Sequence, residues 1–532
     1  MSDYFSTNPT PLQTVGQNVP AEITGRIPAK VMEKNAKVTT TPVLVWNGGE
    51  AKGQPIVFQG VDVKDNGQTV PETGGSVMIP FLVAYQPDMQ TSDLYLDFSV
   101  DQRGKTYDLP RVKVGYGVIS TSTLASAKSV APAVAKDNFQ QVITEKYSAD
   151  IHFLINQANI RANQTDQTSY IDLNKQLIEA NQAPNKEIAG ISVSSYASPE
   201  GSLAFNTQLA EKREQNTTEL VTNQLKKDNI TEFGELTSKF TPEDWEGFQQ
   251  LVEKSNIQDK ELILSVLSMY KDPEEREREI RNLSSVFNEL AEQILPQLRY
   301  SRIQATINVI GKTDEELINI YNTDPSKLSV DEILYIATLT DDNTRKMEIY
   351  KKATELAPND YRTYNNLGAT QYKAGDYANA SKNFTKAAQL NPQAKESAMN
   401  KGLIYILDGN WTQANESLGT AAGLPENQDA LGIYYLQQGE LAKAKTAFGD
   451  AKTNNAALAQ ILSGDYSAAR NTLASISTPD ATTYYLTAIL GARTDNSTMV
   501  MSNLREAIKL DPQLLTRARK DLEFKNYNLS SL

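Results

Sequence analysis

The sequence predicts a multidomain α+β protein with an N-terminal antiparallel β-sandwich, a central α/β domain that carries a helical insertion, and a C-terminal α-solenoid. Three observations predict this class. Short β-branched segments separated by turns occupy the first part, strand and helix patterns alternate in the middle, and a helical pattern repeats in the last part. At roughly 150 residues per domain, 532 residues are enough for about three to four domains.

Charge and composition exclude several classes of function. The chain has 65 acidic and 52 basic side chains, a formal net charge of −13, so it lacks the positive field that attracts nucleic acids and anionic lipids. It has no cysteine and one histidine, His152, which excludes disulfides, thiolate metal sites and zinc sites that need two histidines. His152 lies in an alternating strand pattern that favours a structural role. We therefore expect no cofactor, no metal and no enzymatic activity, with an unrecognised hydrolase as an alternative.

Residues 1–28 are predicted to form a flexible leader. They contain four prolines among small polar residues and offer little to bury. They lack the basic start and the apolar stretch of a signal peptide, and the chain has no run of 18 apolar residues that would cross a membrane. We expect either a cytosolic protein or a mature form whose leader was replaced by Met1.

Residues 29–120 are predicted to form the β-sandwich. Five β-branched segments follow one another at near-regular spacing, and Asn47-Gly48 and Asn66-Gly67 mark turns between them. The segments are 38–46, 56–63, 77–85, 94–100 and 107–114. Residues 121–146, rich in Ser, Ala and Thr, are expected to be a linker or a short helix.

Residues 147–311 are predicted to form the α/β domain. Strands are expected at 151–160, 188–196 and 302–310, and helices at 170–181 and 203–225. Residues 231–297 have three helical segments in a row and are expected to be an inserted helical block. A linker at 312–325 follows.

Residues 326–532 are predicted to be a solenoid because small and large side chains recur at a fixed spacing. Gly368, Ala380 and Phe384 have counterparts 34 residues later at Gly402, Ala414 and Leu418. This period and this small–small–large pattern are the signature of tetratricopeptide repeats, or TPRs.

The concave groove of such an array is the expected docking site for a protein or peptide. Asn366 and Asn400 are equivalent positions in it, and Tyr372 and Lys373 lie nearby. Amide side chains of this kind either hold the backbone of an extended peptide or merely cap and solvate the helix surface.

One stretch of the central domain resembles the C-terminal domain of OmpA. A strand at 191–196 leads into a turn that ends at Gly201, and Asn206, Leu209 and Arg213 follow on a helix at the family's spacing. The resemblance implies binding of peptidoglycan, with Arg213 holding the carboxylate of the diamino-acid stem.

The same resemblance assigns the stem's ammonium to an aspartate, and this chain has Ser198 there. Glu200, two residues later, would have to supply the negative charge. In the alternative, the domain serves other contacts: Ser198 or Ser202 caps the helix, Glu200 favours the helix dipole and Arg213 makes a surface ion pair.

The order of domains resembles the OmpA-family outer-membrane lipoproteins of Bacteroidetes, which have an Ig-like domain, an OmpA-like domain with a helical insertion, and TPRs. That resemblance implies a periplasmic location with membrane contact only through a removed lipid anchor. We expect a non-enzymatic scaffold or anchor whose OmpA-like domain binds peptidoglycan or a partner, and whose TPR array docks a protein. An alternative is an assembly factor for fimbriae or secretion machinery, whose β domain pairs edge strands with a client.

Overall fold

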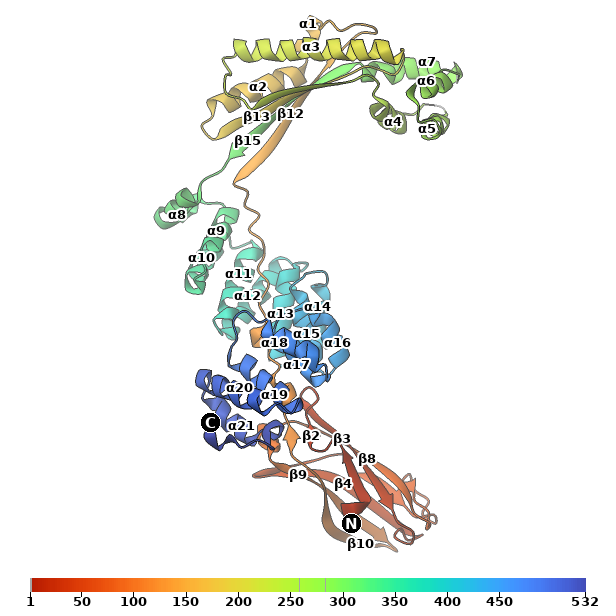
Figure 1. Cartoon of the computed structure of the whole chain (residues 1–532), viewed down its shortest axis with the longest axis vertical. Coiled ribbons are helices and arrows are strands. Elements are labelled where there is room, and N and C mark those ends of the chain that lie inside the picture. Colours follow the sequence, from red (N-terminus) through yellow and green to blue (C-terminus); the bar gives the residue numbers. More distant parts are fainter. Residues whose placement is uncertain (1, 258, 283) are drawn as a thin grey trace. The chain divides into compact units, whose positions relative to one another are not determined.

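The computed structural model describes residues 2–257, 259–282 and 284–532, which form two compact units (Figure 1). One unit comprises Met1–Asp137 and Ser329–Leu532, and the other comprises Asn138–Leu328. The first unit therefore joins the N-terminal β domain to the C-terminal helices, and the central α/β domain stands as a unit of its own. The described part of the chain contains no helix that is both long and apolar enough to span a bilayer.

The N-terminal domain contains two main sheets, whose strands are mostly antiparallel and which share one hydrophobic core. The smaller sheet has the order β1 (Phe5–Asn8), β3 (Asn18–Ile27), β8 (Gly75–Ala84). The larger has the order β10 (Lys105–Tyr116), β9 (Ser92–Gln102), β4 (Ala36–Trp46), β6 (Ile56–Gln59), β7 (Gln68–Thr69), with β5 (Gly49–Lys52) paired to β4. Ile23 and Ile79 of the first sheet are buried against Leu94 and Leu96 of the second. The predicted β-rich region is thus present as a two-sheet sandwich.

The expected flexible leader differs from the structure. Residues 1–28 supply β1, β3 and also β2 (Leu12–Gln13), which pairs in parallel with β11 (Val118–Ile119). Every second side chain of β3 is buried, namely Val19, Ala21 and Ile23. The side chains between them are less buried. The polar composition of residues 1–28 therefore conceals the alternation of buried and more exposed side chains that is typical of a half-buried strand.

The central unit is a four-stranded sheet with two helices packed on one face. Its order is β12 (Val142–His152), β15 (Tyr300–Ile310), β13 (Lys186–Tyr196), β14 (Glu235–Thr241). The helices α2 (Thr168–Gln182) and α3 (Leu203–Lys227) bury Leu177 and Val221 against Ile151 and Ile303 of the sheet. A short helix, α1 (Ala162–Thr165), precedes α2.

Three boundaries of this unit differ from those expected. The first strand begins at Val142 inside the expected linker and ends at His152, not at residue 160. The insertion opens with a strand, β14, that pairs in parallel with β13. The expected linker at 312–325 contains the helix α8 (Asp314–Thr323), which Thr313 caps together with Glu316.

The rest of the insertion is helical as expected and has a small core of its own. It contains α4 (Trp245–Lys254), α5 (Lys260–Met269), α6 (Pro273–Asn282) and α7 (Ser284–Gln293). Phe248, Val252, Ile263 and Leu290 are buried together there. Because these four helices have this separate core, they form a subdomain attached to the sheet.

The C-terminal repeats are confirmed as pairs of antiparallel helices. The pairs begin after α10 (Asn343–Leu356) and end with α20 (Ser497–Leu510), with α9 (Val330–Ile336) preceding α10 and α21 (Gln513–Lys520) following α20. The helices between are α11 (Tyr361–Lys373), α12 (Tyr377–Leu390), α13 (Lys395–Leu407), α14 (Trp411–Thr420), α15 (Asn427–Gln437), α16 (Leu441–Phe448), α17 (Asn454–Leu462), α18 (Tyr466–Ala474) and α19 (Ala481–Arg493).

Glycines in the first helices of several repeats allow the two helices of a pair to touch. A Cβ atom on Gly368 of α11 would lie 2.7 Å from the ring of Phe384 on α12, and one on Gly432 of α15 would lie 2.5 Å from the ring of Phe448 on α16. Any larger residue would push the pair apart. This close approach explains the small–large spacing that reveals the repeat in the sequence.

Candidate functional site

The groove of the repeats holds a segment of the same chain that has two short 3-10 turns, Thr121–Leu124 and Ala127–Ser129, followed by irregular chain at 131–137. We call this segment, residues 121–137, the strap; it follows β11 and lies against the first helices of successive repeats (Figure 1). Asn366 on α11 and Asn400 on α13 are almost completely buried beneath it, with 1% and 0% of their surface exposed. Both of these predicted groove residues therefore face a peptide, and that peptide is the chain's own.

Each of the two asparagines binds both backbone groups of one strap residue. The Asn400 amide accepts from the N–H of Ala133 and donates to its carbonyl, both at 2.8 Å. The Asn366 amide does the same with Ala135, at 2.8 and 2.9 Å. Asn365 adds a donor to the Ala133 carbonyl at 3.1 Å. These pairs satisfy the backbone of alternate residues without requiring any particular side chain.

A third asparagine repeats the arrangement farther along the groove. Asn455 on α17 accepts from the N–H of Ser126 at 3.1 Å and donates to its carbonyl at 2.9 Å. The sequence analysis missed it, yet the signal exists. The later repeats are 30 and 25 residues long, and these offsets lead from Asn400 through Ala430 to Asn455.

Tyr372 contributes a hydroxyl, whereas Lys373 stays outside the groove. The Tyr372 hydroxyl donates to the carbonyl of Ala127 at 2.7 Å. Burial raises the pKa of Tyr372 above its ordinary value, which keeps the hydroxyl protonated as a donor. Lys373, the next residue, is exposed to solvent.

The strap side chains that point into the groove are small. The buried ones are Ala125, Ala127, Val130, Pro132, Ala133 and Ala135, and the partly buried Leu124 packs against the same core. Lys128, Val134 and Lys136 are exposed. The groove thus holds a chain that is rich in alanine, with Pro132 as the one proline among residues 121–137.

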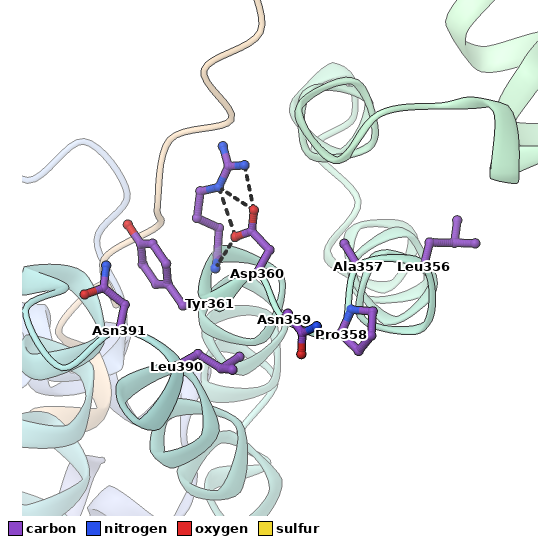
Figure 2. Close-up of a pocket in the computed structure, with 9 residues that line it drawn as sticks. Leu356, Ala357, Pro358, Asn359, Asp360, Tyr361, Leu390 and Asn391 are labelled. Atoms are coloured by element: carbon purple, nitrogen blue, oxygen red, sulfur yellow. Dashed lines mark hydrogen bonds and ion pairs between the residues drawn. The ribbon is translucent and has the colours of Figure 1, made fainter.

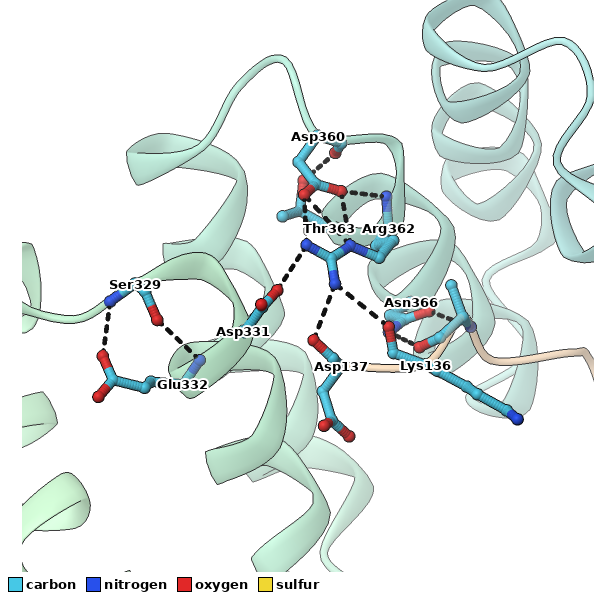
Figure 3. A network of polar contacts seen from close by, with 10 residues as sticks. Lys136, Asp137, Ser329, Asp331, Glu332, Asp360, Arg362, Thr363 and Asn366 are labelled. Atoms are coloured by element: carbon cyan, nitrogen blue, oxygen red, sulfur yellow. Dashed lines mark hydrogen bonds and ion pairs between the residues drawn. The ribbon is translucent and has the colours of Figure 1, made fainter. Parts of the chain in front are cut away.

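Arg362 fastens the far end of the strap (Figure 3). Its guanidinium donates to the carbonyl of Asp137 at 2.8 Å and forms ion pairs with Asp360 and Asp331, each at 2.7 Å. Only 12% of the Arg362 side chain is exposed. Burial opposes ionisation of Asp360, but the hydrogen bonds from Arg362 outweigh it and hold the pKa of Asp360 below its usual range.

The near end of the strap is fastened by the last helices. Thr121 donates to Glu523 at 2.6 Å, and Glu523 pairs with Arg493 of α19 at 2.6 Å. Arg517 of α21 donates to the hydroxyl of Thr123 at 3.1 Å. Both ends and the middle of the strap are therefore bound to the helices. Because the strap follows β11, these contacts attach the β domain to the TPR array.

A shallow hollow lies beside the Arg362 cluster, at the loops between helices (Figure 2). It has a volume of about 640 Å³ and is lined by Leu356, Pro358, Asp360 and Leu390. The one carboxylate among these four is held by Arg362, and Leu356 is 40% exposed.

Arg213, the predicted ligand for a stem carboxylate, is completely buried on α3. Its guanidinium donates to the backbone carbonyls of Gln157, Tyr196 and Leu154, at 3.0, 2.8 and 3.3 Å. It also lies over the ring of Phe153, 4.9 Å from the ring centroid. Burial, with a smaller contribution from nearby Arg299, lowers the pKa of Arg213 to about 10. In this structure a ligand carboxylate does not reach Arg213, and the side chain instead holds a loop against the end of β13.

The remaining predicted peptidoglycan residues lie together but bind one another. Glu200 forms a two-pronged ion pair with Arg299, both contacts at 2.9 Å, and Ser198 donates to Glu200 at 2.7 Å. Asn206 is buried and donates to the carbonyl of Gly201 at 2.9 Å. The negative charge that a ligand ammonium would need is thus already held by Arg299. The sequence pattern places Glu200 in the turn before α3. It does not show that Glu200 pairs with Arg299, which directly precedes β15 and is distant in the sequence.

The histidine and its neighbours on the opposite face of the sheet also interact internally. Asp150, two residues before His152, forms a two-pronged ion pair with Arg302, both contacts at 2.8 Å. The backbone N–H of His152 donates to Gln164. Among the residues that the structure describes, no group of three or more His, Asp or Glu could hold a metal ion.

Comparison with known proteins identifies one repeat. Residues 361–394 match the tetratricopeptide repeat family. No curated protein matches the chain.

Several solved structures resemble it in part. A tetratricopeptide repeat protein from Parabacteroides merdae is 14% identical over 37% of this chain and 85% of its own, with a TM-score of 0.31. PilF of Pseudomonas aeruginosa is 16% identical over 37% of this chain and 97% of its own, with a TM-score of 0.31. YrrB, described as a TPR protein with an unusual peptide-binding site, is 18% identical over 39% of this chain and 100% of its own, with a TM-score of 0.23.

Proposed function

We propose that this protein is a non-enzymatic interaction scaffold whose TPR array binds extended, small-residue protein segments by their backbone. One observation carries the proposal: Asn366, Asn400 and Asn455 each bind the N–H and the carbonyl of a single residue of the strap. Backbone recognition of this kind suits alternate residues of an extended chain. It gives affinity without a specific side-chain code.

The tethered strap competes with any partner for the same groove. A segment linked to its site has an effective concentration on the order of millimolar, so a free peptide of equal affinity displaces it only at similar concentration. A partner segment therefore needs either higher affinity or a release of the strap. While the strap occupies the groove, it holds the β domain and the TPR array together as one unit.

A labelled peptide with the sequence of residues 121–137 tests this function. In the full chain, Ala133→Pro with Ala135→Pro removes two strap N–H donors and frees the groove without altering any groove residue. We expect the peptide to bind this variant and not the unmodified protein. Adding Asn400→Ala should then abolish binding, whereas adding Lys373→Ala should not. Absence of binding to the folded double-proline variant would contradict the proposal.

Peptidoglycan binding by the central unit stays a prediction of the resemblance at residues 191–213. The burial of Arg213 argues that any such binding uses other side chains. A pull-down of the full chain with purified sacculi tests it, with heat-denatured protein as the control. Retention by sacculi would support the prediction, and recovery of all protein in the supernatant would contradict it.

We further propose that the scaffold works at the periplasmic side of the outer membrane as a lipoprotein. The support is the domain order of the sequence, an Ig-like, an OmpA-like and a TPR region, which resembles lipoproteins of that location. Fractionation of cells that express the protein from its own gene tests this. We expect the protein in the outer-membrane fraction; recovery from the cytosol would contradict the proposal.

A further inference from the structure

An apolar cavity of about 290 Å³ opens between the two sheets of the N-terminal domain. The smaller sheet contributes Ile27 and Ile79, and the larger sheet contributes Val38, Phe58 and Phe98. Protein interiors are close-packed, with few voids larger than a water molecule, and leaving apolar volume empty costs stability. A cavity of about 150 Å³ with similar walls is enough to hold benzene. This space is therefore large enough for a ligand.

One polar group inside the cavity lacks a partner. Thr40 of β4 lines the cavity and is completely buried, and its Oγ1 atom has no hydrogen-bond partner among the residues that the structure describes. A buried unsatisfied hydroxyl is unfavourable unless something binds it. A ligand oxygen in the cavity would supply the missing hydrogen bond.

The mouth of the cavity has apolar and acidic character. The exposed lining residues include Tyr4, Val31 and Leu109, which are 46%, 60% and 39% exposed, together with the carboxylate of Glu33. No lysine or arginine is among the lining residues of the described chain. A carboxylate or phosphate headgroup would therefore find no cationic partner among these lining residues and would be repelled by Glu33.

We propose that this cavity binds one hydrocarbon chain that carries a neutral oxygen function, such as a fatty alcohol or an acyl ester. At about 30 Å³ per water-sized group, the volume accommodates about ten methylene-sized groups. The apolar walls bind the chain, and the hydroxyl of Thr40 binds its oxygen. This site is independent of the TPR groove and of the proposed scaffold function.

Titration of the full chain with 1-octanol and with octanoate at neutral pH tests the proposal. The two probes share a chain length and differ in headgroup charge. We expect 1-octanol to bind and to raise the melting temperature of the protein, with an affinity at least about tenfold higher than that of octanoate. Failure to bind 1-octanol up to its solubility limit would overturn the proposal, and equal binding of octanoate would overturn the neutral headgroup.

Two variants locate the binding. Val38→Phe fills the cavity and should abolish binding, whereas Val61→Phe, at an exposed position outside the lining, should not change it. Thr40→Val replaces the hydroxyl by a methyl group of similar size and should weaken the binding of 1-octanol by about three- to tenfold while raising the stability of the ligand-free protein. Unchanged binding in folded Val38→Phe would overturn the site.

A second measurement keeps the proposal testable if Val38→Phe does not fold. Methyl NMR of the unmodified chain should show shifts of the Ile27 and Ile79 methyl signals on addition of 1-octanol, because both residues line the cavity. If other methyl signals shift while those of Ile27 and Ile79 stay unchanged, the ligand binds elsewhere and the proposal is overturned.

Discussion

At the scale of single residues, the sites depend on polar side chains that bind backbone atoms. Asn366 and Asn400 could be predicted as groove residues, because equivalence across a repeat follows from counting. The burial of Arg213 could not be predicted, because Leu154 and Gln157, whose carbonyls bind it, were expected in a strand over 151–160 and instead lie in a loop after β12. A sequence motif identifies the residue type at a position, but whether that side chain is exposed depends on the tertiary packing around it.

Asn400→Ala should destabilise the unit that contains the strap by about 1–3 kcal/mol. The substitution leaves the N–H and carbonyl of Ala133 with fewer partners in a buried site. Urea unfolding measures the change, and limited proteolysis should reveal a strap that is cut faster. Lys373→Ala, at an exposed neighbouring position, is the matched control and should change stability by less than about 0.5 kcal/mol. Equal effects of the two substitutions would contradict the assigned role of Asn400.

Arg213→Met should destabilise the central unit by about 3 kcal/mol or more. It removes three hydrogen bonds from a completely buried guanidinium to backbone carbonyls, of which that of Leu154 keeps a second donor, the N–H of Gln157, in the loop. Thermal unfolding measures the loss, with Arg278→Ala, whose side chain is 62% exposed, as the control. A folded variant with unchanged stability would show that Arg213 is not the structural residue described here.

The contact between Arg362 and Asp360 should loosen in acid. The pKa of Asp360 in the folded protein lies below its ordinary value of 3.8, so ionised Asp360 stabilises the fold above pH 3.8, and this contribution is lost as the pH falls through the lower folded value. Unfolding measured between pH 6 and pH 2 should show the unmodified protein losing its advantage over Asp360→Asn below about pH 3.8. A constant difference across that range would contradict this account.

At the scale of helices and strands, the repeats were predictable and the edges of the domains were not. The spacing of Gly368, Ala380 and Phe384 reveals the helix pairs because close packing demands small residues at fixed positions. The strands β1, β3 and β14 were missed. β1 and β14 are short and largely polar, so their place in a sheet depends on the strands with which they pair. β3 has the alternating pattern of a half-buried strand, but the prolines and small polar residues around it favoured a flexible segment.

Two glycine substitutions test the packing of the helix pairs. Gly432→Ala places a Cβ atom 2.5 Å from the Phe448 ring and should destabilise the array by about 1–3 kcal/mol. Gly419→Ala, in α14 with nothing within 4 Å of the added atom, should stabilise it by up to about 1 kcal/mol. Chemical denaturation measures both. Equal and small effects at the two positions would contradict close packing at Gly432.

At the scale of the whole molecule, the strap makes one unit from two regions that are far apart in the sequence. Composition marked residues 121–146 as a linker because the segment is rich in Ser and Ala. That property also lets its residues 125–135 fit a narrow groove. A segment can thus be irregular and still be fully bound, when its hydrogen bonds go to side chains of another domain.

Native-state hydrogen exchange of the Ala133 and Ala135 amides in the full chain tests the central claim most directly. Both amides donate to buried asparagines, so we predict exchange as slow as in the helices α11 and α13 beneath them. Exchange at the rate of an unstructured peptide, with α11 and α13 still protected, would show that the groove does not hold the strap.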